Sequence, residues 1–204
     1  MAACARCISY YRMMNFALFE TAVGSCGIAW SERGIVGVQL PERSEAATRN
    51  RLLRRFPAAC DAAPPADVRR TIDDIVALLG GERRDLNHVR IDLEAKSEFH
   101  RRVYEAARRI PAGATLSYGE IAERLGDRNL ARDVAEALSQ NPCPIIVPCH
   151  RVLAAGGKAG GFSAPGGVAT KLRLLTIEGA QPQGRMEAPL LFDRLPLATA
   201  RPRR

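Results

Sequence analysis

Hydrophobic and polar residues alternate along the first part of the chain, over residues 16–40. Two apolar runs with the two-residue period of β-strands flank a polar turn at 31–34, which predicts a hairpin. Residues 44–56 have their basic residues along one side of a helix, and residues 68–79 repeat apolar positions at helical spacing. Alternation returns at 89–93 and predicts a further strand. The first 95 residues therefore predict a small α/β unit, and no cluster of reactive residues marks it.

The second part of the chain has a helical period almost throughout. Ser97 is a good N-cap for a helix with one apolar face. Ser117 and Glu120 have the spacing of a capping box, which predicts that a short helix begins there. A second helix is expected over 128–140, after a turn that contains Gly126. Two short helices joined by such a turn have the outline of a helix-turn-helix, so we expect a mostly helical, winged-helix-like unit.

These patterns divide the chain into four segments. Both ends lack periodicity, and the C-terminal end is rich in Pro and Arg, so we expect both to be disordered. The expected segments are an N-terminal tail at 1–15, an α/β structural domain at 16–95, a helical domain at 96–182 and a basic tail at 183–204.

The composition is that of an ordinary globular protein, with 47% hydrophobic and 25% charged residues. The net charge of +8 favours an anionic partner, which could be nucleic acid, an anionic lipid surface or an acidic ligand. Most of the excess lies in the second half, because residues 96–182 carry +4 and residues 183–204 carry +3. An anionic polymer would therefore meet the C-terminal half more readily.

The cysteines and the N-terminus indicate a protein of the cytoplasm, either free or associated with the nucleoid. No apolar stretch reaches the roughly 20 residues of a membrane-spanning helix, and Arg6 and Arg12 interrupt the stretch where a secretion signal would lie. We therefore expect a protein that is not secreted, in which the six cysteines are reduced thiols. Cys4 and Cys7 have the spacing of half a zinc site, but no second pair of ligands completes it, so we expect no metal.

The residues most typical of chemistry follow a short apolar run at 144–147, which we expect to be a buried, strand-like element. The run ends at Pro148, and Cys149, His150 and Arg151 come next. Cationic neighbours lower the pKa of a thiol and raise the fraction of the nucleophilic thiolate. A histidine can act as a general base, directly or through a water molecule. A cysteine in an apolar run is more often an inert core residue, so the Cys-His pair alone leaves both roles open.

Pro148-Cys149-His150-Arg151 resembles the active-site signature of the O6-alkylguanine-DNA alkyltransferases, or methylated-DNA–protein-cysteine methyltransferases. Other blocks of that family occur in the same order, and together they cover about residues 97–180. The first 95 residues resemble the family only in general shape. The further blocks are Phe99 to Ala122, Ala131-Arg132 to Asn141-Pro142, and then Gly160-Gly161-Phe162-Ser163, Lys171, Leu174-Leu175 and Glu178-Gly179.

This resemblance implies DNA repair in a single turnover. An alkyl group, methyl or larger, would move irreversibly from O6 of guanine to Cys149 after the base has rotated out of the double helix. The partner would be double-stranded DNA that contains O6-alkylguanine, bound through its minor groove by a monomer of this protein, and no cofactor would be needed. The sequence leaves open whether O4-alkylthymine is a second substrate and which alkyl groups are preferred.

The resemblance assigns catalytic roles to five residues. Cys149 would be the nucleophile and the permanent acceptor. His150 would take the thiol proton through a bridging water molecule, and Glu178 would orient His150 and stabilise its charge. Tyr118 would help to bind the flipped base and would stabilise the leaving guanine. Asn141 would be the hinge that joins the recognition helix to the active-site segment.

Further matched residues would contact DNA or line the substrate pocket. Arg132 in the recognition helix would fill the gap left by the rotated nucleotide, and Val152 and Ser163 would read the guanine edge, Val152 through backbone atoms. The DNA contacts implied in this way are those of Ala131, Arg132, Arg151 and Tyr118. The pocket would be lined by Tyr118, Val152, Phe162, Ser163, Pro144 and Gly160.

Three features depart from the usual pattern of the family. Asp133 and Glu136 lie on or near the helix that would face DNA phosphates, where carboxylates would weaken binding. The loop 164–167 is about two residues longer than the commonest pocket loop, which bears on the alkyl groups that fit. Phe162 stands where the family usually has Tyr, so the apolar wall would be kept and a hydroxyl lost.

Three other functions fit some of these residues. A non-enzymatic protein that binds alkylated DNA can share this fold, but such proteins lack the acceptor cysteine, and Cys149 argues against this function. A winged-helix transcription regulator has no use for the Cys-His-Arg triplet. A thiol hydrolase with Cys149, His150 and Glu178 as its triad would need direct contact between adjacent side chains that point differently. The alkyltransferase is the interpretation that we favour.

Overall fold

The computed structural model describes residues 14–180. The expected disorder of residues 1–13 and of the basic tail 183–204 lies outside the described residues, and so do Cys4 and Cys7. Asn15, which the sequence pattern left in the N-terminal tail, is the first residue of a strand. No helix among residues 14–180 is long and apolar enough to cross a membrane.

A four-stranded sheet forms the centre of the N-terminal part, and its strands have the order β3-β2-β1-β4. The first three strands are antiparallel neighbours, and β4 pairs in parallel with β1. The hairpin predicted around residues 31–34 is confirmed as β2 and β3, whereas the sequence pattern did not separate β1 from it. The strands are β1 (Asn15–Thr21), β2 (Gly24–Ser31), β3 (Gly34–Gln39) and β4 (Cys60–Asp61).

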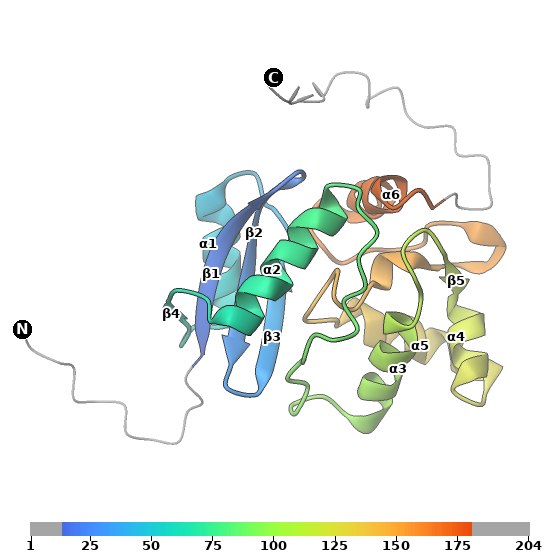
Figure 1. The fold of residues 1–204 in the computed structure, drawn as a ribbon. Coiled ribbons are helices and arrows are strands. Elements are labelled where there is room, and N and C mark those ends of the chain that lie inside the picture. Colours follow the sequence, from blue (N-terminus) through green and yellow to red (C-terminus); the bar gives the residue numbers. More distant parts are fainter. Residues whose placement is uncertain (1–13, 181–204) are drawn as a thin grey trace, which may run out of the picture.

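Helix α1 (Glu45–Arg55) and helix α2 (Ala66–Leu79) lie on opposite faces of this sheet (Figure 1). Both confirm the helices predicted over 44–56 and 68–79. The side chain of Ser44 accepts a hydrogen bond from the backbone of α1, which stabilises the start of this helix. The prediction of a strand at 89–93 is wrong, because only an isolated bridge between Ile35 and Ile91 forms there.

The C-terminal part is mostly helical, as expected (Figure 1). Ser97 caps the first of its helices, and Ser117 and Glu120 form the predicted capping box. The four helices are α3 (Glu98–Arg108), α4 (Tyr118–Arg124), α5 (Ala131–Ser139) and α6 (Gly167–Ile177). The short elements are β5 (Leu116–Ser117), β6 (Val152–Leu153) and the 3-10 turns η1 (Arg128–Leu130), η2 (Cys149–Arg151) and η3 (Ala155–Gly157).

The segment 143–152 lies between two hydrophobic cores. Cys143 and Ile146 pack with the sheet and α2, whereas Val147 and Cys149 pack with α3, α4 and α5. The apolar run 144–147 is buried as predicted, but it is a tight turn rather than a strand-like element. The backbone N–H of Val147 donates to the carbonyl of Cys143 (2.8 Å). Prolines at both ends of the run lack the N–H that a strand would need.

Tyr104 in α3 joins this helix to α5 and gives a test of the packing. Its side chain is fully buried, and its hydroxyl donates to the carbonyl of Ala137 (2.9 Å). We expect Tyr104→Phe to lower the free energy of unfolding by about 1 kcal/mol, because one buried hydrogen bond is lost. Tyr104→Ala should lower it by about 3–5 kcal/mol, because a cavity remains as well. Urea unfolding measures both, and equal losses for the two variants would contradict the packing described here.

Candidate active site

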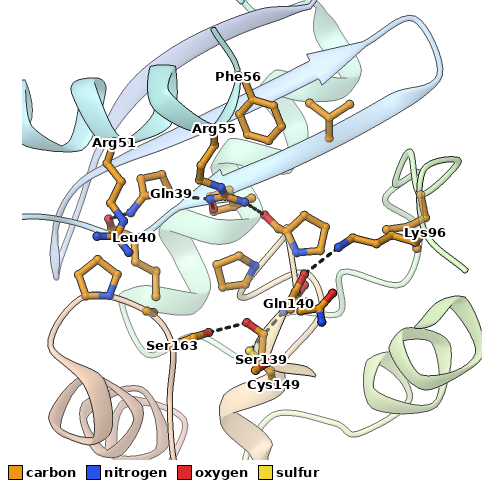
Figure 2. A pocket seen from close by; sticks show the side chains of 18 of the residues that line it. Gln39, Leu40, Arg51, Arg55, Phe56, Lys96, Ser139, Gln140, Cys149 and Ser163 are labelled. Carbon is orange, nitrogen blue, oxygen red and sulfur yellow. Dashed lines mark hydrogen bonds between the residues drawn. The ribbon is translucent and has the colours of Figure 1, made fainter. Parts of the chain in front are cut away.

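Cys149 opens the 3-10 turn η2 and reaches the wall of a cavity of about 560 Å³ (Figure 2). The thiol residue is buried, with 8% of its surface exposed. Four residues that the sequence singled out share this cavity with it, namely Asn141, Pro144, Phe162 and Ser163. The opposite wall comes from the N-terminal part, through residues of β3 and α1 that the sequence did not mark, including Gln39, Arg51, Arg55 and Phe56.

Asn141 holds the active-site segment through its side-chain amide. Its Nδ2 donates to Cys149 Sγ (3.2 Å) and to the carbonyl of Val147 (2.8 Å). Its Oδ1 accepts from the backbone N–H of Cys143 (3.0 Å). One side chain therefore fixes three points of the turn and supplies a hydrogen-bond donor to sulfur.

Burial raises the pKa of the Cys149 thiol, although the hydrogen bond from Asn141 and the charge of Lys171 oppose this rise. The sequence predicted that His150 and Arg151 would lower this pKa, and that prediction is wrong. Arg151 is paired with a carboxylate, and burial lowers the pKa of His150, so that its ring is neutral near pH 7. The thiol is therefore stored in its protonated form, and it needs a base before it can attack.

His150 and Glu178 lie in direct contact, as the resemblance implied. His150 Nε2 and Glu178 Oε1 are 2.9 Å apart, and neither side chain is more than 2% exposed. Burial raises the pKa of Glu178, but hydrogen bonds from His150 and Arg151 outweigh it and bring this pKa to about 2. Glu178 is thus ionised and can only accept, so Nε2 of His150 carries the ring hydrogen.

The second ring nitrogen of His150, Nδ1, is the atom left to receive a proton. Since Nε2 carries the hydrogen, Nδ1 of the neutral ring has a free lone pair. Nδ1 is buried and has no hydrogen-bond partner among the described residues. No direct hydrogen bond between His150 and the Cys149 thiol is found among residues 14–180, which argues against a direct Cys-His pair. A buried acceptor without a partner is costly unless a small donor reaches it.

Arg151 does not point to the surface. Its guanidinium donates to both oxygens of Glu178, from Nε (2.8 Å) and from Nη2 (2.8 Å), and also to the carbonyl of Ile110. Its side chain is 6% exposed. The predicted contact of Arg151 with DNA is therefore not supported by this structure, because the charge is already paired inside the protein.

Lys171 is a buried cation to which the sequence analysis gave no role. Its Nζ donates to the carbonyl of Val152 (2.6 Å) and lies 5.8 Å from the centre of the Tyr118 ring. Burial lowers the pKa of Lys171 to about 8, against the opposing effect of Cys149. Leu174 and Leu175, three and four residues along α6, are buried too. This helical spacing is the signal in the sequence from which an inward position of Lys171 could have been predicted.

Tyr118, Val152 and Gly160, which were predicted to line the substrate pocket, do not line the cavity at Cys149 and lie near Lys171 and one another instead. Gly160 lies against Tyr118, since a Cβ at Gly160 would come within 3.6 Å of that ring. The N–H of Val152 donates to the carbonyl of Cys149, and its own carbonyl accepts from Lys171, which leaves one carbonyl lone pair for a ligand. Ser163 Oγ donates to the carbonyl of Ser139 (2.9 Å), which ties the pocket loop to the end of α5 (Figure 2).

Helix α5 presents an outward face with mixed charges. Arg132, Asp133 and Glu136 are exposed on it, while Ala131 at its start is partly exposed. Its opposite face packs inward through Val134, Ala137 and Leu138. The two acidic side chains that depart from the family pattern are therefore at the surface.

Comparison with known proteins decides the family. The model of the DNA-binding domain of 6-O-methylguanine DNA methyltransferases matches residues 98–180. Methylated-DNA–protein-cysteine methyltransferase of Methanothermobacter thermautotrophicus is 35% identical over 159 residues, which are 78% of this chain and 82% of that protein. The chain belongs to the methylated-DNA–protein-cysteine methyltransferase family. The family that the signature residues predicted is thus confirmed, and the similarity extends over most of the chain.

Other members of the family support the same assignment. The methyltransferase of Mycobacterium tuberculosis strain H37Rv is 41% identical over 130 residues, which are 63% of this chain and 74% of that protein. A crystal structure of Mycobacterium tuberculosis OGT in complex with DNA superimposes with a TM-score of 0.65 at 30% identity. That superposition covers 81% of this chain and 92% of that one. The fold of the family therefore extends over the N-terminal part, which the sequence matched only in general shape.

The buried carboxylate makes the stability of this family member depend on pH. The pKa of Glu178 falls from 4.5 to about 2 on folding, so its ionised form stabilises the fold above about pH 4.5. We expect Glu178→Gln to lower the free energy of unfolding by about 3 kcal/mol near pH 7, because the buried Arg151 loses its counter-charge. As pH falls through about 2, Glu178 becomes neutral and the difference between wild type and variant should shrink. Urea unfolding at several pH values measures this difference in the free energy of unfolding. A difference that stays constant with pH would refute the lowered pKa of Glu178.

Proposed function

We propose that this protein repairs DNA by moving the alkyl group of O6-alkylguanine irreversibly to its own Cys149, once per molecule. The observation that carries this proposal is a thiol at a cavity wall beside a buried histidine whose Nδ1 is unpartnered and whose Nε2 is fixed by Glu178. The names of its relatives point to the same chemistry. We also propose that it works as a monomer in the cytoplasm, where its thiols stay reduced.

The proton of the thiol has a short route in this proposal. A water molecule between Cys149 Sγ and His150 Nδ1 would carry the proton to the ring, and the ionised Glu178 would stabilise the imidazolium that forms. This route supplies the base that the raised pKa of the thiol requires. Asn141 and Lys171 would stabilise the thiolate, since both already oppose the effect of burial on it.

The transfer itself is an in-line displacement at carbon. The thiolate of Cys149 forms the new C–S bond while the bond between carbon and O6 breaks, and the electron pair of that bond leaves with guanine. Tyr118 would donate a proton to the leaving base, against the effect of burial, which raises the pKa of its hydroxyl. The thioether has no route back, so one molecule performs one reaction. No cofactor takes part in these steps.

DNA recognition is proposed for the helical half. We propose that α4 and α5 act as a helix-turn-helix, that α5 enters the minor groove, and that Arg132 fills the gap left by the flipped nucleotide. Ala131 would allow close approach to the backbone, and Tyr118 would contact the DNA beside the flipped base. In this proposal residues 16–95 form a structural domain, and residues 96–182 form the domain that binds DNA and accepts the alkyl group.

The flipped guanine would lie between Tyr118, Val152 and Gly160, and its alkyl group would point to Cys149. The free lone pair of the Val152 carbonyl and the hydroxyl of Ser163 would read the guanine edge. Pro144 and Phe162 would form the apolar wall around the alkyl group, since both line the cavity that holds the thiol.

Peptide mass after incubation with a duplex that contains O6-methylguanine tests the reaction directly. We expect the peptide that ends in Cys149-His150-Arg151 to gain one methyl group per protein molecule, and Cys149→Ala to gain none. No gain together with tight binding to the lesion would replace this proposal by that of a non-enzymatic damage sensor.

The role of Arg132 can be separated from the chemistry. We expect Arg132→Ala to slow transfer from O6-methylguanine in duplex DNA by about tenfold or more, because less of the unstacking cost is offset. Transfer from the free base O6-benzylguanine, which needs no flipping, should keep its rate. Arg70→Ala, an exposed change in α2, is the matched control. Equal slowing with both substrates would place Arg132 outside the flipping step.

A further inference from the structure

The segment that leads to Cys149 is held through the backbone carbonyl groups of Gln140 and Pro142, the two neighbours of Asn141. The carbonyl of Pro142 accepts two hydrogen bonds, from the backbone N–H of Val38 (3.0 Å) and from Arg55 Nη2 (2.7 Å). The carbonyl of Gln140 accepts from Lys96 Nζ (3.2 Å) (Figure 2). Asn141 is thus fixed on both sides, at Pro142 by groups of β3 and α1 and at Gln140 by Lys96, which lies just before α3.

Arg55 is the most strongly held of these donors. Its Nη1 donates to the carbonyl of Val38 (2.9 Å) and to Oε1 of Gln39 (3.2 Å), while Nη2 reaches Pro142. Gln39 is itself buried, and its Nε2 donates to the carbonyl of Leu40 (2.9 Å). The three acceptors of Arg55 are neutral, so the guanidinium serves here as a planar fork that spans two parts of the fold.

The position of Asn141 matters because its Nδ2 is the side-chain donor to Cys149 Sγ. A hydrogen bond to sulfur weakens steeply when the donor moves by a few tenths of an ångström or changes its angle. Whatever fixes the backbone of residue 141 therefore also controls how well the thiolate is stabilised.

We propose that Arg55, in the part of the chain that shows no reactive cluster, is a positioning residue for Cys149, and that it acts by holding the carbonyl of Pro142 and so the amide of Asn141. This inference adds a role to the site of the proposed function, although its main test does not depend on alkyl transfer. The alternative is that Arg55 only joins the two parts of the fold, in which case its loss would lower stability and leave the thiol unchanged.

The test measures how the reactivity of the thiol depends on pH. Full-length protein is treated with iodoacetamide from pH 6 to pH 10, and the labelling rate of Cys149 is read from the fragment masses of its peptide, which separate Cys149 from Cys143. The variants are Arg55→Gln, Arg55→Lys and, as control, the neighbouring exposed residue in Arg54→Gln. The other groups near the thiol are kept in all variants, namely His150 with Glu178, Lys171 in α6, Tyr104 in α3 and Tyr118 in α4.

We expect Arg55→Gln to move the labelling profile to higher pH and to slow labelling about tenfold at pH 7.5, which corresponds to about one unit in the pKa of the thiol. Arg55→Lys should lie between wild type and Arg55→Gln, since one donor can still reach Pro142. Arg54→Gln should match wild type. Urea unfolding of each variant checks that the protein is folded at every pH used.

An unchanged profile for folded Arg55→Gln would overturn the proposal, and so would a loss of rate that is the same at every pH. Should Arg55→Gln fail to fold, Arg55→Lys and Gln39→Ala, which removes one anchor of the guanidinium, decide by the same profile. A wrong proposed function would give a different result, because wild-type protein would then take no methyl group from O6-methylguanine, whatever the pH profile of its iodoacetamide labelling.

Discussion

The active site depends on one buried carboxylate. Glu178 is the only acidic side chain among residues 14–180 that is buried, and it joins the end of α6 to the turn η2. Burying a charge is costly unless partners satisfy it, and here His150 and Arg151 supply three hydrogen bonds. This pairing fixes the tautomer of His150, and it leaves Nδ1 as the acceptor. Arg151 extends the same network to the carbonyl of Ile110, which follows α3, so a single ion cluster aligns α3, η2 and α6.

The position of the thiol between two hydrophobic cores explains why it is unreactive at rest and can still become a nucleophile. Burial keeps Cys149 protonated, and a protonated thiol resists oxidation and unwanted alkylation. A protein that reacts only once gains from this protection, because any earlier modification would end its activity. The same burial requires that every group that stabilises the thiolate be placed accurately. Asn141 is placed by its contacts with Cys143 and Val147, and Lys171 by its hydrogen bond to the carbonyl of Val152, so the positions of both depend on the segment 143–152.

Local patterns predicted the parts of the fold that depend on near neighbours in the chain. The caps Ser97 and Ser117, the helix ending at Leu79 and the β2–β3 turn could all be identified, because each depends on residues a few positions away. The turn at Ile145, with φ of +75°, could not be identified, since an apolar run between prolines fits a strand equally well. The pairing of Arg151 with Glu178 spans 27 residues, and that of Arg55 with Pro142 spans 87. Contacts of this range leave no periodic signal, so the roles of both arginines emerged only from the structure.

The charges around α5 suggest that different residues insert into the base stack and attract the DNA phosphates. Its outward face carries one arginine and two carboxylates, so the helix that would enter the groove contributes no net attraction to phosphates. Exposed Arg124 and Arg128 lie just before it, at the end of α4 and in η1, and both could face the phosphates that flank the groove. Binding strength would then come from the turn before α5, whereas Arg132 would act only after the base has moved. In such a division of tasks, Asp133 and Glu136 repel the phosphates that α5 approaches, so the attraction has to come from the basic residues outside this helix.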